Sequence, residues 1–167
     1  MKYLLFNYCL LCLCLASFAC SQKKLDKTNT NSTKSIAESP IFYTSHEPKK
    51  KDAPFSDVVK VGDLYFLSGQ IGLDHSSRTL VEGGIQAETL QTLENIKAVL
   101  LQHDLSMKDV VKVLVILDDI EDFGEMNKIY TTYFPQKPAR TTFAAEALAR
   151  GAKIEIEVIA LKSGLQK

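Results

Sequence analysis

Residues 109–130 read DVVKVLVILDDIEDFGEMNKIY, which combines a strand pattern and a helix pattern in one short stretch. The almost continuous apolar run in the first half predicts a β-strand that is covered on both faces. Asp119 and Asp122 follow in a capping-box-like arrangement, which indicates the start of an amphipathic helix. The expected buried stripe of that helix is Phe123, Met126, Tyr130 and Tyr133, and its end is marked by Pro135 and Pro138.

Further strands and one more helix are predicted on both sides of this unit. The expected elements are strands at 55–61, 64–71, 141–145 and 154–161, a helix from Ile85 to His103, a loop at 72–84 and a short edge strand at 41–43. The order of the main elements is β-β-α-β-α-β-β. This order predicts an α+β domain whose mixed sheet carries two helices on one face.

The second face of the predicted sheet has a mixed character. In KIEIEVIAL (153–161), Glu155 and Glu157 alternate with apolar residues, as expected of an antiparallel strand with one face in solvent. The neighbouring strands are too apolar for a fully hydrated surface. We therefore expect the protein to oligomerise through this face.

Composition and charge restrict the class of protein. The 167 residues are 46% hydrophobic and 24% charged, as in a globular protein with one ordinary domain. From Ala53 onward, 12 lysines and arginines stand against 16 aspartates and glutamates, a net charge of −4 that argues against a nucleic-acid binder. All four cysteines lie in the first twenty residues, and the three histidines show no ligand spacing, so no metal site is expected.

The first twenty residues are typical of an export signal. Lys2 gives a positive start, residues 3–18 form an apolar run, and Ala19-Cys20 is a small-residue cleavage point. ASFAC (16–20) resembles a bacterial lipobox, in which the cysteine is lipidated, while a plain secretory signal and an uncleaved anchor are the alternatives. The pattern predicts an exported protein on the periplasmic or cell-surface side, held at the membrane by a lipid on Cys20.

A flexible linker is predicted between this signal and the folded part. Residues 21–52 are rich in Ser, Thr, Asn and Lys and show little apolar periodicity. Such a segment cannot bury enough surface to offset the entropy lost on ordering. The expected organisation is therefore a signal at 1–20, a linker at 21–52 and one domain at 53–167.

From Ala53 to Leu161 the chain resembles the Rid/YjgF family of small enamine/imine deaminases. The matching segments, in the family's order and spacing, are APF, LSGQIG, LENIKAVL, DVVKVLVILDDIEDFGEMNKIY, PARTTF and KIEIEVIAL. The pairing of PAR with EIE, which places Glu155 fifteen positions after Arg140, is the most specific of them. The resemblance implies a chorismate-mutase-like fold and a homotrimer whose sheets form a central barrel, with active sites in the clefts between subunits.

The resemblance also implies roles for individual residues. In the family, the arginine at the position of Arg140 holds the carboxylate of a 2-imino or 2-enamino acid, a task suited to its planar fork of donors. Glu155 matches the glutamate that positions and activates the attacking water, helped by a backbone carbonyl at Thr142. Ser68, Gly69 and Asn127 match other pocket positions. The implied reaction yields a 2-oxo acid and ammonia and needs no metal or organic cofactor.

Two positions depart from the family pattern. Phe55 stands where many deaminating members have a tyrosine, and Thr142 stands where some have a cysteine. Loss of one hydrogen bond costs about 0.5–1.5 kcal/mol, which would weaken the activity without abolishing it. We therefore expect a deaminase with an altered substrate preference.

Other interpretations of the same residues remain open. By itself, Arg140 is explained by a salt bridge, and Glu155 and Glu157 by a hydrated strand face. A non-catalytic trimer that binds small carboxylates or a protein partner in the same clefts is the alternative function. The ribonuclease activity attributed to some relatives is disfavoured by the acidic domain.

Overall fold

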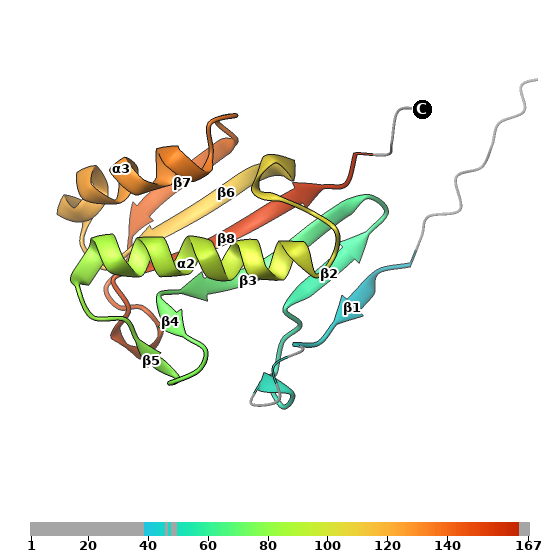
Figure 1. Cartoon of the computed structure of the whole chain (residues 1–167), viewed down its shortest axis with the longest axis horizontal. Coiled ribbons are helices and arrows are strands. Elements are labelled where there is room, and N and C mark those ends of the chain that lie inside the picture. The colour runs from blue at the N-terminus through green and yellow to red at the C-terminus, as the bar shows by residue number, and fades with distance from the viewer. Residues whose placement is uncertain (1–38, 46, 48–49, 164–167) are drawn as a thin grey trace, which may run out of the picture. The chain divides into compact units, whose positions relative to one another are not determined.

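A computed structural model of the chain describes residues 39–45, 47 and 50–163 (Figure 1). The predicted signal at 1–20, with Cys20, lies outside the described residues, as does most of the predicted linker at 21–52. No helix in the described part is both long and apolar enough to span a membrane.

The described residues form a six-stranded sheet in the order β1-β2-β3-β8-β6-β7. Neighbouring strands are antiparallel except for β6 and β7, which run parallel. Because β1 pairs with β2, the sheet begins inside the segment predicted as linker. The strands are β1 (Ile41–Tyr43), β2 (Val58–Val61), β3 (Leu64–Ile71), β6 (Val110–Leu117), β7 (Ala139–Ala144) and β8 (Ile154–Leu161).

Two helices, α2 (Gly84–Leu101) and α3 (Phe123–Tyr133), cover one face of this sheet (Figure 1). Their buried side chains share one core with alternate residues of the central strands. Short 3₁₀ turns connect the later elements, namely η2 (Met107–Asp109), η3 (Ile120–Asp122) and η4 (Ala149–Gly151). The predicted α+β architecture with two helices on one face is therefore confirmed.

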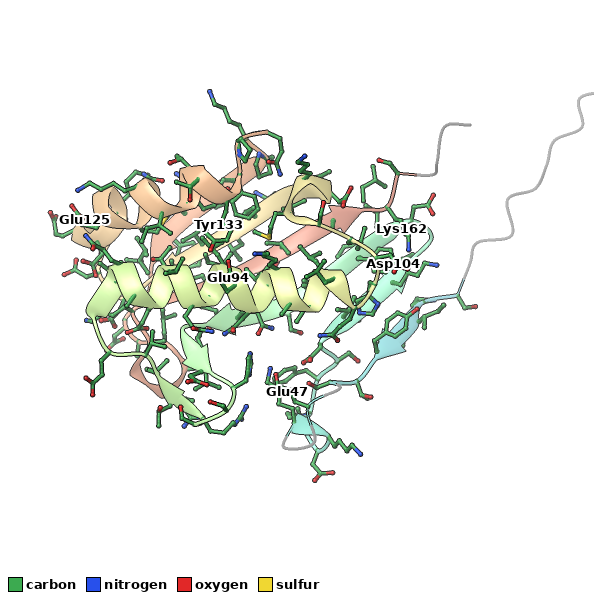
Figure 2. The ribbon with its side chains drawn as sticks, in the orientation of Figure 1. Glu47, Glu94, Asp104, Glu125, Tyr133 and Lys162 are labelled. Carbon is green, nitrogen blue, oxygen red and sulfur yellow. The ribbon has the colours of Figure 1, made fainter. Side chains whose placement is uncertain are left out.

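A hydrogen bond joins the middle of α2 to the last residue of α3 (Figure 2). The Tyr133 hydroxyl on α3 donates to the Glu94 carboxylate on α2 across 2.5 Å. Burial and this bond raise the pKa of Tyr133 to about 12, while the same bond lowers the pKa of Glu94. The pair fixes the two helices against each other on the solvent side of the core.

The predicted start of the second helix needs correction. Asp119 does cap a turn, since its side chain accepts from the Glu121 N–H at 3.0 Å, but that turn is η3 and α3 begins only at Phe123. Met126 and Tyr130 are buried as expected. Phe123 is 37% exposed, so its assignment to the buried stripe was wrong.

The segment 72–84, predicted as a loop, contains a small hairpin of β4 (Leu73–Asp74) and β5 (Thr79–Leu80). Its turn is held by the Asp74 carboxylate, which accepts from both the N–H and the hydroxyl of Ser76 at 2.7 Å. The hairpin stands apart from the main sheet as a separate two-stranded sheet.

The sheet face opposite the helices is open in the single chain. Strand β6 was expected to be covered on both faces, but its residues alternate between buried Val113 and Val115 and half-buried Leu114 and Ile116. Large apolar side chains lie exposed across this face, among them Phe66, Phe143 and Leu161. A sheet face that exposes several large apolar side chains, beside Glu155 and Glu157, is typical of a surface that a partner covers.

Candidate active site

Arg140 lies on the edge strand β7 and points to the helix-covered face of the sheet. Its strand neighbour is Val113, a core residue, and its guanidinium reaches α3. There Nη1 donates to the Asn127 Oδ1 at 2.7 Å, and the guanidinium carbon lies 4.5 Å from the ring centroid of Tyr130 and 5.3 Å from that of Phe123. The exposed position of Phe123 is explained by this contact, in which two aromatic rings and an amide hold the cation.

The surroundings of Arg140 leave its charge available. Among the described residues, no carboxylate lies within ion-pair distance of the guanidinium. The hydroxyls of Tyr130 and Thr142, both buried, have no hydrogen-bond partner within that same part of the chain. Burial raises the pKa of Tyr130, so its hydroxyl remains a donor. A bound anion would neutralise the charge of Arg140 and would also accept hydrogen bonds from the two hydroxyls.

Glu155 lies on β8 and points to the open face of the sheet, opposite to the face that Arg140 occupies. Its neighbours Ile154 and Ile156 are buried beneath the helices, so the alternation of the strand turns Glu155 to the open face. Burial, and to a lesser extent the charge of Glu157, raises the pKa of Glu155. A carboxylate with a raised pKa is a stronger proton acceptor than a free glutamate.

Gly69 on β3 explains how the Glu155 side chain fits against the sheet. A Cβ at position 69 would lie 2.0 Å from the Glu155 Oε1, so only glycine leaves room for the carboxylate. The adjacent Ser68 has a structural role, since its hydroxyl donates to the Ser56 carbonyl at 2.7 Å. That bond fixes the segment that carries Phe55, and Ser68 does not itself line the cavity beside Glu155.

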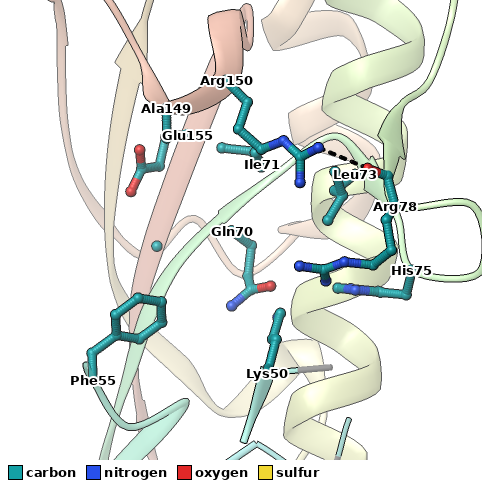
Figure 3. A pocket seen from close by; sticks show the side chains of 11 residues that line it. Lys50, Phe55, Gln70, Ile71, Leu73, His75, Arg78, Ala149, Arg150 and Glu155 are labelled. Carbon is teal, nitrogen blue, oxygen red and sulfur yellow. Dashed lines mark hydrogen bonds between the residues drawn. The ribbon is translucent and has the colours of Figure 1, made fainter. Parts of the chain in front are cut away.

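A cavity of about 260 Å³ opens beside Glu155 (Figure 3). Three predicted site residues line it, namely Phe55, Gly69 and Glu155. Arg140, Asn127 and Thr142 are absent from its lining. The cavity also contains residues that the sequence did not single out: Lys50, Gln70, His75, Arg78, Ala149 and Arg150. In the described residues, no three His, Cys, Asp or Glu side chains are placed to hold a metal ion.

The predicted site residues thus fall into two groups on opposite faces of one sheet. Arg140, Asn127 and Thr142 belong to the helix-covered face, and Glu155 with Gly69 belongs to the open face. A single chain therefore cannot bring Arg140 and Glu155 to one small ligand. The two groups are candidate half-sites.

Comparison with known proteins identifies the family. Residues 44–162 match the family described as Endoribonuclease L-PSP. The chain belongs to this family. It is 42% identical over 123 residues to a RutC family protein of Pyrococcus horikoshii (73% of this chain, 97% of that one). It is 44% identical over 110 residues to the 2-iminobutanoate/2-iminopropanoate deaminase of Mus musculus (65% and 82%).

The structural comparison agrees with this assignment. The crystal structure of the Escherichia coli YjgF gene product superposes with a TM-score of 0.67 at 28% identity, covering 74% of this chain and 99% of that one. The expected YjgF-type fold and the Rid/YjgF resemblance are both confirmed. Because members of the L-PSP family carry different functional names, the activity of this chain has to be argued from its site.

Proposed function

We propose that the protein hydrolyses reactive 2-imino and 2-enamino acids to 2-oxo acids and ammonia. The observation that carries this proposal is the guanidinium of Arg140, held by Asn127 and two aromatic rings without a carboxylate partner among the described residues. Such a group binds the carboxylate of an imino acid through two parallel hydrogen bonds. The name of the mouse relative is consistent with that substrate class.

Glu155 supplies the proton chemistry in this proposal. A water adds its oxygen to the carbon of the C=N bond, and the Glu155 carboxylate takes one proton from that water. For a protonated imine, this gives a carbinolamine that carries a hydroxyl and an amino group. Glu155 returns its proton to the nitrogen and the C–N bond breaks, so that ammonia leaves. The hydroxyl then gives its proton to the Glu155 carboxylate as the C=O bond of the 2-oxo acid forms, and ammonia takes up the proton that Glu155 finally releases. The backbone carbonyl of Thr142 is a second acceptor for the attacking water. Orientation by Arg140 supplies the remaining part of the rate enhancement.

The two half-sites imply that the active protein is an oligomer. We propose a homotrimer in which the Arg140 half-site of one copy faces the Glu155 half-site of the next. Support comes from the opposite orientation of the two side chains and from the apolar side chains exposed on the open sheet face. The sheets of three copies would then line a central barrel.

The same proposal includes export. The lipobox-like ASFAC (16–20) supports lipidation of Cys20, which would hold the trimer at the membrane on the periplasmic or cell-surface side. Replacement of Cys20 by serine should release the protein from membranes, as measured by fractionation. Retention of the Cys20→Ser protein in the membrane fraction would contradict an anchor at this residue.

The activity is tested with imino acids made in situ by an amino-acid oxidase, with semicarbazide to trap the imine that remains. Wild type should suppress trapping, and Arg140→Ala should not. Glu155→Gln should lose about 10²–10⁴-fold in kcat/KM. Glu157→Gln, on the same strand and face, is the matched control and should keep its activity.

If a trimeric wild type does no better than Arg140→Ala with several imino acids, catalysis is the wrong assignment. The clefts would then be binding sites for small carboxylates. Phe55, which lines the cavity without a hydroxyl, favours this second candidate. Calorimetry with a 2-oxo acid would then measure binding directly.

A further inference from the structure

The cavity beside Glu155 contains positive side chains that the proposed hydrolysis does not use. In Figure 3, Glu155 and Phe55 lie on one side of the cavity and Arg78 on the other, with Arg150 near the top. The chain has three arginines in all, and two of them line this one cavity. Lys50 adds a third cation to the wall.

Arg78 and Arg150 are fixed to each other although 72 residues separate them. The Arg150 Nη2 donates to the Arg78 carbonyl at 2.9 Å, which ties the turn of the β4–β5 hairpin to η4. Both residues have left-handed backbone, with φ of 63° for Arg78 and 62° for Arg150. A non-glycine residue rarely adopts this conformation, and such strain concentrates at binding sites.

The charges in this region are not balanced. The Glu47 carboxylate contacts Lys50 at 3.5 Å and Arg78 at 3.4 Å, and it lies 2.8 Å from the Nδ1 of His75. One acidic group therefore faces two cations here, and with Glu155 and Arg150 included, three cations stand against two carboxylates around the cavity. Arg150 has no carboxylate within ion-pair distance in the described part of the chain. Burial lowers the pKa of His75, so this histidine adds little charge.

From this geometry we infer that Arg78 and Arg150 bind a second acidic group of the ligand, one that lies on the ligand's side chain. The inference rests on the proposed function and names its substrate class: 2-imino dicarboxylic acids, the imines of acidic amino acids. Arg140 of one copy would hold the carboxylate next to the imine. The apolar side chains of Ile71 and Leu73, which also line the cavity, suit the methylene groups between the two acidic ends.

Binding is measured first, because it does not depend on catalysis. The full chain is titrated by calorimetry with 2-oxoglutarate and with 2-oxobutanoate, the dicarboxylic and monocarboxylic products. Wild type should bind 2-oxoglutarate at least about tenfold more tightly, as expected for one charge-assisted contact. Arg150→Gln and Arg78→Gln should remove most of this preference. Lys97→Gln, which removes an exposed positive charge on α2, is the matched control.

Rates are measured second, with the imine of aspartate made by an aspartate oxidase and the imine of alanine made by an amino-acid oxidase. Wild type should have the higher kcat/KM for the imine of aspartate. Arg150→Gln should lower that value about tenfold or more and leave the value for the imine of alanine almost unchanged. This split separates a specificity residue from one that supports the fold.

The two proposals fail in different ways. Hydrolysis of the imine of alanine, together with equal affinity for the two oxo acids, would overturn the inference and leave the deaminase intact. A preference for 2-oxoglutarate that disappears in Arg150→Gln, without hydrolysis of any imine, would support the acidic subsite and overturn the proposed reaction. A preference that both arginine variants retain would also overturn the inference.

Discussion

Replacement of Gly69 by alanine places a methyl group directly against the Glu155 carboxylate. The new Cβ would lie 2.0 Å from Oε1, 2.9 Å from Cδ and 3.0 Å from Cγ. Cβ contacts under 3.0 Å are essentially never seen, so the oxygen has to move by at least 1.0 Å (3.0 − 2.0). The obstacle is the end of a flexible side chain rather than backbone. Glu155 should therefore be displaced while β3 and β8 stay paired.

The size of the effect follows from that displacement. A shift of about 1 Å at a reacting centre costs about 10²-fold in rate, which corresponds to about 2.7 kcal/mol. We expect Gly69→Ala to lose about two orders of magnitude in kcat/KM for imine hydrolysis. The free energy of unfolding should decrease by less than about 1 kcal/mol, since no buried contact is removed.

The assay pairs semicarbazide trapping with denaturant unfolding, and two other glycines supply controls. A Cβ at Gly124 meets nothing within 4 Å, so Gly124→Ala should keep full activity and stabilise α3 by about 0.5–1 kcal/mol. A Cβ at Gly72 would lie 2.7 Å from the Glu88 Cα, so Gly72→Ala should destabilise the fold. Wild-type kcat/KM in a folded Gly69→Ala protein would show that the position of the Glu155 carboxylate does not limit hydrolysis.

Three further predictions concern the stability of the fold, the titration of the Glu155 carboxylate and the assembly. Tyr133→Phe should lower the free energy of unfolding by about 0.5–1.5 kcal/mol, because it removes the bond to Glu94. In the wild type this bond lowers the pKa of Glu94 in the folded protein. Urea titrations should therefore show the difference between the two proteins above pH 4.5, and it should disappear as the pH falls through the lowered pKa of folded Glu94. Since the pKa of Glu155 is raised, kcat/KM should fall with decreasing pH through a value above 4.5, and the acid limb should persist in Glu157→Gln. Phe66→Glu, on the open sheet face, should give a folded monomer by light scattering and abolish hydrolysis; a trimer with full activity would contradict the assembly.

Regular elements were predictable from the sequence because their periodicity is local. Alternation over eight residues defined β8 at Ile154–Leu161, and helical spacing located α2 within a residue or two at each end. The β4–β5 hairpin was missed because strands of two residues are too short to show alternation. Phe123 fits a helical stripe by spacing alone, and only the tertiary position of Arg140 explains its exposure.

The composition of the site was less predictable than the fold. Arg140 and Glu155 stand out in the sequence, but the face that Arg140 occupies depends on the parallel pairing of β7 with β6, which no local pattern specifies. Arg78 and Arg150 lie in turns without periodicity, and their proximity is a product of the tertiary fold. The left-handed backbone is shared with Asp104 and Lys137, so the cavity that the two arginines line and the bond between them are what distinguish them from other surface residues.

The position of the two half-sites makes assembly a condition of the proposed activity. The side chain of Arg140 can be ordered within one chain, since α3 supplies the hydrogen bond and both ring contacts of its guanidinium. Glu155 is likewise ordered by β3 within one chain. Neither half needs the other in order to fold, so a monomeric variant should retain each half intact and still lack activity. Mixing a folded Arg140→Ala protein with a folded Glu155→Gln protein should therefore restore hydrolysis at the clefts that receive both wild-type halves, whereas a site contained within one chain would recover nothing.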